Sequence, residues 1–332
     1  MKLIIKLLLV LSLCFSGLLA GQSWRDWQTF QASAVNPDGD MVLWLAPGSH
    51  FGDLVQKLQR LGLAKARWEW RMLGRLENPQ IKAGEYFIDS GTTLSALLDQ
   101  LAQGEIRQHR LTIVEGWTAA RLRAELADDP RLISEAAGVS EPDLMATLGC
   151  EGCFAEGWFL PETYFFERGS SDLDILQRAH EAMRDALANT WSDRDESAPL
   201  SSPEELLVLA SIIERETGAD GERGRVAGVF ARRLDLGMRL QTDPTVIYGL
   251  GPEFEGRLRR VHLRTDHPWN TYTRHGLPPT PIALPGLESL RAAARPVPGT
   301  ALYFVSRGDG THQFSDTLAE HNAAVNRYIR GR

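Results

Sequence analysis

Leu209-Ala-Ser-Ile-Ile-Glu-Arg-Glu-Thr217 is an amphipathic stretch that carries two acids, Glu214 and Glu216, near its end. Upstream, Ser202 is a good N-cap, Pro203 suits the first helical position and Glu205 completes a capping box. These signals predict a helix over 203–217. At about 100° per residue, one face of this helix carries four apolar side chains, which are Leu206, Leu209, Ala210 and Ile213.

The two acids lie differently on this helix. Glu216 falls at the border of the apolar face, whereas Glu214 points further round and Arg215 points to solvent. A carboxyl at such a border can be partly desolvated, which raises its pKa and keeps its proton available near neutral pH. A general acid needs this property, so the helix end predicts a glycan-cleaving enzyme with Glu216 at its centre. The alternative is that both acids are solvated surface residues, as most glutamates are.

The length and the net charge of the chain limit the number of domains and the kinds of partner that it can have. A chain of 332 residues suits roughly two domains, and its net charge of −7 argues against a nucleic-acid partner. The sequence has no His-Glu-x-x-His motif, no phosphate-binding loop and no convincing ligand spacing among its eight histidines. We therefore expect neither a metal nor another cofactor.

The N-terminus differs from the body. Residues 3–21 are almost wholly apolar, Lys2 and Lys6 lie on their N-terminal side, and the first acid is Asp26. This pattern predicts either a secretory signal peptide or one membrane-spanning helix whose N-terminus is cytoplasmic. In both cases the body is exported. In an exported protein, Cys150-Glu-Gly-Cys153 favours a local disulfide over a redox site or a zinc site.

The pattern of elements predicts an α+β fold. After a linker over 22–40, residues 41–104 alternate as strand, helix, helix, strand and helix, which makes a compact α+β module. A larger mixed α/β domain is predicted over 105–330. Its expected helices cover 118–127, 141–147, 171–190, 203–217, 222–236 and 316–330, and its expected strands cover 110–114, 302–305 and 312–314.

Residues 237–286 are predicted to form a long loop rich in Gly, Pro and Thr. Loops of this length in a compact domain usually carry function. Aromatic faces with a few hydrogen-bonding side chains bind sugar rings, and Tyr248, Trp269, Asn270 and Tyr272 match that combination. The alternative is a structural loop with ordinary turn residues.

Several segments form a recognisable set that runs in order over about residues 40–325: Lys82-Ala-Gly-Glu-Tyr86, Val114-Glu-Gly-Trp117, Glu156-Gly-Trp-Phe-Leu-Pro-Glu-Thr163, Leu209-Ala-Ser-Ile-Ile-Glu-Arg-Glu-Thr217, Gly237-Met-Arg-Leu-Gln-Thr-Asp-Pro-Thr-Val-Ile-Tyr-Gly249, Asn270-Thr-Tyr272, Gly276-Leu-Pro-Pro279, Pro281-Ile-Ala-Leu-Pro-Gly286, Leu302-Tyr-Phe-Val305, His312-Gln-Phe314 and His321-Asn322. Together they resemble one family, the endolytic murein transglycosylases (YceG-like proteins). Asp266-His-Pro-Trp269, Thr280 and Leu284 depart from the residues usual in the family.

The resemblance implies an architecture and a location. Residues 1–21 would be an uncleaved inner-membrane anchor with its N-terminus in the cytoplasm, and the body would be periplasmic. Residues 41–104 would be a LysM-like subdomain, and residues 105–330 the catalytic domain. Implied partners are peptidoglycan strands, with peptidoglycan synthases or division proteins as further candidates.

The resemblance also implies a reaction. Glu216 would be the catalytic residue that cleaves the bond between N-acetylmuramic acid (MurNAc) and N-acetylglucosamine (GlcNAc), leaving 1,6-anhydro ends and limiting strand length. Glu214 would support it. The candidates for holding the sugar are Gln241, Thr242, Asp243, Tyr248, Asn270 and Tyr272.

Three alternatives stay open at this point. Asp243 precedes a proline and alternatively caps a local turn. A hydrolase would use Asp243 or Glu214 as a second carboxyl. A non-catalytic scaffold would bind the cell wall through the small module alone.

Overall fold

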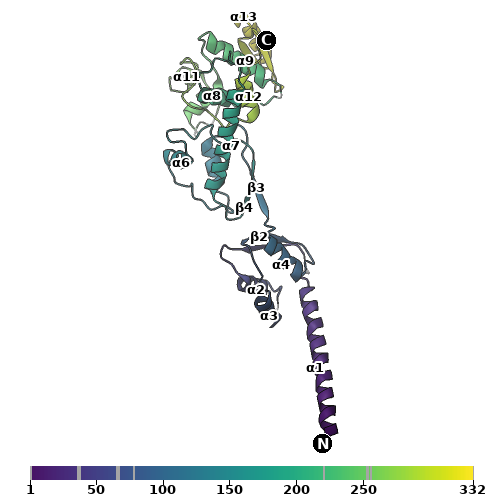
Figure 1. Cartoon of the computed structure of the whole chain (residues 1–332). Helices are drawn as coiled ribbons and strands as arrows, with labels where there is room; N and C mark the ends of the chain where they lie inside the picture. The colour runs from purple at the N-terminus through teal and green to yellow at the C-terminus, as the bar shows by residue number, and fades with distance from the viewer. Residues whose placement is uncertain are drawn as a thin grey trace. The chain divides into compact units, whose positions relative to one another are not determined.

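The computed structural model describes residues 2–35, 39–64, 68–77, 79–219, 221–251, 254 and 256–331 (Figure 1). The predicted α+β class is confirmed. Contacts divide the chain into two compact units: Met1–His109 with Glu167–Gly169, and Arg110–Phe166 with Ser170–Arg332. The predicted domain bounds after residues 21, 40 and 104 stay predictions.

The first helix is longer than the predicted apolar segment. Helix α1 (Lys2–Gln31) continues through residues 22–31, so the first half of the predicted linker is helical. Near its end, Phe30 is buried and meets Trp70 edge-on at 5.1 Å between ring centroids. Residues 36–38 of the predicted linker lie outside the described residues. In the part of the chain that the structure describes, no helix combines the length and hydropathy of a membrane span.

The smaller unit has the predicted order of elements. Strands β1 (Met41–Leu45) and β2 (Gly84–Ile88) pair antiparallel, with Met41 opposite Ile88. Helices α2 (Phe51–Arg60), α3 (Trp68–Leu76) and α4 (Leu94–Gln103) pack with them. Alternation along the strands buries one face, because successive side chains point to opposite sides of a sheet. The core residues on that face are Leu43, Leu45, Tyr86 and Ile88.

One part of the larger unit packs around a long central helix. Strand β3 (Gln108–Thr112) pairs with β4 (Thr163–Glu167), a strand that the sequence analysis missed. Helices α5 (Ala119–Ala127) and α6 (Glu141–Thr147) form one core with α7 (Asp172–Ser192). After α6, Cys150 and Cys153 form the predicted local disulfide.

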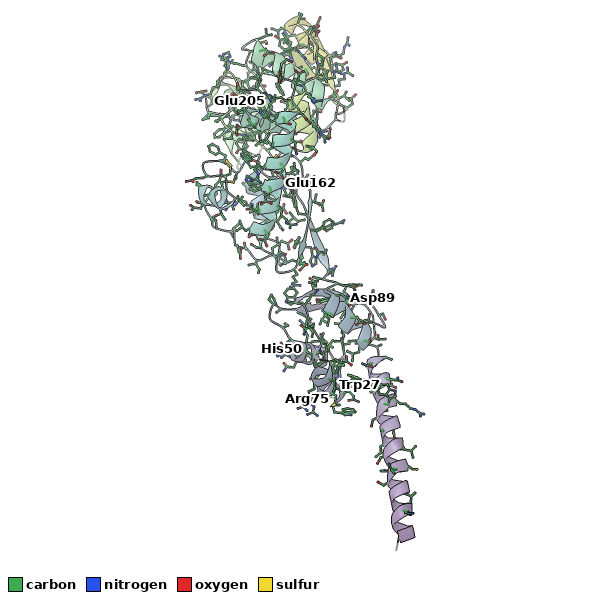
Figure 2. All side chains as sticks on the ribbon, in the orientation of Figure 1. Trp27, His50, Arg75, Asp89, Glu162 and Glu205 are labelled. Carbon is green, nitrogen blue, oxygen red and sulfur yellow. A yellow bond between two sulfur atoms is a disulfide. The ribbon has the colours of Figure 1, made fainter. Side chains whose placement is uncertain are left out.

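The other part is built around α8 (Pro203–Glu216), which packs against α7, α9 (Arg223–Asp235) and α12 (Leu287–Ala294) (Figure 1). Two predicted start signals of α8 are confirmed: Pro203 lies in its first turn, and Ser202 Oγ accepts from the backbone N–H of Glu205 at 3.3 Å. The predicted capping box does not form, because the carboxylate of Glu205, labelled in Figure 2, accepts from the backbone N–H of Ser201 in place of that of Ser202. Strands β5 (Tyr303–Ser306) and β6 (His312–Ser315) form an antiparallel hairpin, and α13 (Leu318–Tyr328) follows.

The prediction of a continuous loop over 237–286 was wrong. Two short helices interrupt it, α10 (Asp243–Leu250) and α11 (Arg260–Arg264). Pro244 and Gly249 suggested a loop, but proline is tolerated in the first turn of a helix, where its missing N–H has no intrahelical partner. Helix α10 packs against α8, so part of this segment lies close to that helix.

Candidate active site

Glu216 is the last residue of α8, and Thr217 after it is extended. Behind it, Ile212 and Ile213 are fully buried, whereas the side chain of Glu216 keeps partial contact with solvent. The hydroxyl of Thr242 donates to Glu216 Oε1. Within the described residues, no hydrogen bond reaches Glu216 Oε2. One carboxyl oxygen is therefore held by the protein and the other is left for a bound molecule.

The surroundings favour the protonated form of this carboxyl. Burial raises the pKa of Glu216 and is the largest influence. The negative charge of Asp243 raises the same pKa further, while the Thr242 hydrogen bond and the positive charges of His312 and Arg233 lower it. Arg233 is fixed in place because its guanidinium donates to the backbone carbonyls of residues 302 and 240, at 2.7 and 2.8 Å.

Thr242 is held by two further buried threonines. Its backbone N–H donates to Thr271 Oγ1 at 3.1 Å, and Thr271 Oγ1 lies 2.9 Å from Thr245 Oγ1. Thr245 Oγ1 donates in turn to the carbonyl of Thr242 at 2.8 Å. Just before this turn, Gln241 is exposed and adopts the left-handed conformation (φ 51°). Thr245 and Thr271 were not predicted as site residues, although both stand in the quoted motifs.

Asp243 and Tyr272 form the outer part of the site. The Tyr272 hydroxyl donates to Asp243 Oδ1 at 2.5 Å, and Asp243 is exposed. Burial raises the pKa of Tyr272, and the carboxylates of Asp243 and Glu216 raise it further. Tyr272 therefore stays a neutral hydrogen-bond donor. The structure thus brings together Glu216, Thr242, Asp243 and Tyr272, with Gln241 next to them.

Asn270 is used differently from the prediction. It is fully buried, and its amide nitrogen donates to the carbonyls of Thr265 and His262, at 2.7 and 3.2 Å. Its amide oxygen accepts from the backbone N–H of Tyr272 at 2.9 Å. Asn270 therefore shapes the segment that delivers Tyr272.

Tyr248 is also committed to protein contacts. Its hydroxyl has side-chain hydrogen bonds to Glu156 and Thr280, and its ring meets Trp269 edge-on at 5.6 Å. Burial raises the pKa of Tyr248. This side chain is a structural element behind Thr242 and Asp243, on the same helix.

Both carboxyl oxygens of Glu214 have partners within the protein. Its Oε2 accepts from the backbone N–H of Gly286 at 2.9 Å and from Ser289 Oγ at 2.7 Å. Its Oε1 lies 3.5 Å from the guanidinium of Arg223, and only 5% of the side chain is exposed. Glu214 joins α8 to the start of α12, which is a supporting position.

Comparison with known proteins decides the family. The model of the YceG-like family matches residues 43–327. The chain belongs to the YceG-like family. Within the described residues, no group of three or more His, Cys, Asp or Glu side chains is arranged to hold a metal ion.

Three bacterial proteins that are similar to this chain carry the same name. A protein of Bacillus subtilis (strain 168), named endolytic murein transglycosylase, is 31% identical over 75% of this chain and 73% of its own length. Proteins of the same name from two Streptococcus pneumoniae strains, D39 and R6, are 23% identical over 99% of this chain. The match spans 66% of the length of these pneumococcal proteins.

A solved structure agrees with the family assignment. The crystal structure of a YceG-like protein from Listeria monocytogenes superposes with a TM-score of 0.55 at 27% identity. The match covers 86% of this chain and 98% of that one. The family region starts within β1 and ends within α13, so it includes every residue of the Glu216 site.

Proposed function

We propose that this chain is an endolytic lytic transglycosylase that cuts peptidoglycan between MurNAc and GlcNAc. The names of its relatives support the activity. The single observation that assigns the activity to a residue is the unequal hydrogen bonding of the two Glu216 oxygens. Thr242 donates to Oε1, and Oε2 has no protein partner in the described chain. Burial raises the pKa of this carboxyl, as a general acid requires.

In the first step, Glu216 donates its proton to the glycosidic oxygen while the bond from that oxygen to C1 of MurNAc breaks. The GlcNAc hydroxyl leaves with the proton. In the second step, the Glu216 carboxylate takes the proton of the MurNAc C6 hydroxyl, and the C6 oxygen bonds to C1. The product is a 1,6-anhydro ring, and Glu216 is protonated again.

This two-step reaction consumes no water and needs one carboxyl group. The C6 hydroxyl belongs to the same sugar as C1, so its effective concentration is high. Gln241, Asp243 and Tyr272 border Glu216 and are proposed to hydrogen-bond the sugars. Because the Tyr272 hydroxyl donates to Asp243 Oδ1, this pair offers its remaining oxygen lone pairs as acceptors for sugar hydroxyls.

A glycoside hydrolase is the alternative reaction, because Asp243 is an exposed carboxylate beside Glu216. Hydrolases place a second carboxyl across the bond as a base or a nucleophile. Glu214 suits that task less well, since both of its oxygens already have protein partners. A wall-binding scaffold would need neither acid.

Mass spectrometry of strand ends separates these functions. The full chain in detergent would be incubated with purified glycan strands, beside Glu216→Gln and Glu214→Gln. We expect 1,6-anhydro-MurNAc ends from the wild type and from Glu214→Gln, and none from Glu216→Gln. Reducing MurNAc ends would indicate the hydrolase, and intact strands with a folded wild-type protein would indicate the scaffold.

We further propose that α1 anchors the protein in the inner membrane once, with a cytoplasmic N-terminus and a periplasmic body. The apolar run 3–21 behind Lys2 and Lys6 supports this topology. The smaller unit is proposed to be LysM-like and to contact glycan, and synthases or division proteins are proposed partners that would direct cutting to nascent strands. Fractionation of the full chain beside a chain starting at residue 32 tests the anchor: only the full chain should sediment with membranes.

A further inference from the structure

Glu156 is a buried carboxyl that the proposed reaction does not use. Only 7% of the residue is exposed, and Oε1 accepts from the backbone N–H of Ala119, the first residue of α5, at 3.0 Å. Its second side-chain partner is the hydroxyl of Tyr248. No basic side chain in the described part of the chain forms an ion pair with it. A buried carboxyl without a counter-ion is costly unless it is hydrogen-bonded, so its hydrogen bonds, including those with Ala119 and Tyr248, hold it in place.

Tyr248 links Glu156 to α10, because it is a residue of that helix. Its hydroxyl also bonds with Thr280, whose Oγ1 accepts from Trp269 Nε1 at 2.9 Å and donates to the carbonyl of Pro281 at 2.9 Å. The next residue, Gly249, packs so closely on the His267 ring that an added Cβ would lie 2.1 Å from it. The C-terminal end of α10 is therefore held through the Tyr248 hydroxyl and through the packing of Gly249 on the His267 ring.

The other end of α10 is at the catalytic site. The helix has eight residues, its N-cap is Thr242, and Asp243 is its first residue. A helix this short moves as one body, because its backbone hydrogen bonds link its two ends within about two turns. A shift at Tyr248 therefore moves the Thr242 hydroxyl relative to Glu216.

We propose that Glu156 is a positioning residue: through Tyr248 it fixes α10 and so places the Thr242 hydroxyl on Glu216. The effect on catalysis rests on the proposed function, whereas the effect on α10 does not. Burial raises the pKa of Glu156 to about 7, so the protonated and the ionised carboxyl are both populated near neutral pH.

Hydrogen–deuterium exchange on the full chain tests the structural part. Glu156→Ala should raise deuterium uptake over 243–250, and Glu156→Gln should restore protection, because its amide can accept from Ala119 and bond with Tyr248. The matched control is Asp172→Ala, since Asp172 is 1% exposed and accepts from the backbone N–H groups of residues 135 and 136, at 2.8 and 2.9 Å. It should raise uptake over 133–137 alone. Unchanged uptake over 243–250 in a folded Glu156→Ala protein overturns the proposal, whatever its activity.

A double-mutant cycle tests the path to the reaction. Glu156→Ala and Thr242→Val should each lower kcat roughly tenfold with little change in KM, and the double variant should also lose roughly tenfold rather than a hundredfold. Glu156→Gln should recover most of the rate. Additive losses would overturn the path through Thr242. Failure of the proposed function would look different, because then Glu216→Gln would match the wild type in the same assay.

Discussion

Glu214 and Glu216 lie two residues apart near the C-terminal end of α8, and they differ in how many protein partners their carboxyl oxygens have. Glu214 has protein partners on both oxygens and a nearby arginine. Glu216 has one donor, on one oxygen. A fully paired carboxylate stabilises the fold but has no free site for a proton, whereas a half-paired and partly desolvated one can exchange a proton with a substrate. The difference in pairing, more than burial, separates a structural acid from a candidate catalytic one.

The largest expected effect is on catalysis at Glu216. Glu216→Gln should lower the rate of strand cleavage by about 10³-fold or more, because the amide can neither donate nor take the transferred proton. The thermal unfolding midpoint should stay near that of the wild type, since a partly desolvated carboxyl is replaced by a neutral group of the same shape. Retained activity in this variant would remove the contrast between the two acids.

The same substitution at Glu214 should have the opposite outcome. Glu214→Gln should lower the free energy of unfolding by about 2 kcal/mol, because it removes one of the two carboxylates, Glu214 and Glu115, that lie beside the mostly buried guanidinium of Arg223. The cleavage rate per folded molecule should stay within about threefold of the wild type. Denaturant titration gives the first quantity and an assay below the melting temperature gives the second. A large rate loss without loss of stability would make Glu214 a catalytic candidate after all.

Glu156 sharpens the comparison as a third acid, buried but paired without a cation. Its pKa is raised from 4.5 to about 7, so the folded state holds this proton more tightly than the unfolded state does. Its stabilising contribution is complete below pH 4.5 and is lost as the pH rises to about 7, by about 3 kcal/mol. Glu156→Gln should remove this part of the pH dependence. Urea titrations at pH 5 and pH 8 measure it, and an unchanged difference between the two pH values contradicts the assignment.

The smallest effect concerns the charge beside Glu216. After burial, the negative charge of Asp243 raises the pKa of Glu216, so Asp243→Asn should lower that pKa by less than about one unit. The rate falls when Glu216 loses its proton, and the alkaline limb of the pH–rate profile should move to lower pH. Asparagine still accepts from Tyr272, which limits the structural change. A limb that moves to higher pH would show that Asp243 does not act on Glu216 through its charge.

The start of α8 could be predicted because its signals are local. The N-cap and the proline are neighbours in the sequence, and the helix begins at Pro203 as they indicate, while it ends at Glu216, one residue before the predicted end. Helical spacing also placed Glu216 at the edge of the apolar face. The α+β class and the elements of the smaller unit followed from the same kind of local pattern.

What could not be predicted depends on residues far apart in the chain. The helical position of Glu214 gave no sign of its partners, because Gly286 and Ser289 lie 72 and 75 residues away. The threonine contacts that hold Thr242 likewise join positions 26 to 29 residues apart. Asn270 was chosen for its polarity, but burial turned its amide toward backbone carbonyls.

The measurement that tests the central claim most directly is cleavage by the full chain in H₂¹⁸O, with mass spectrometry of the new strand ends. If Glu216 alone carries the proton between the glycosidic oxygen and the C6 hydroxyl, the new MurNAc ends are anhydro and contain no ¹⁸O. New reducing ends that carry ¹⁸O would contradict the account, because they would show that water attacked C1 and that a second carboxyl, with Asp243 first to be tested, takes part.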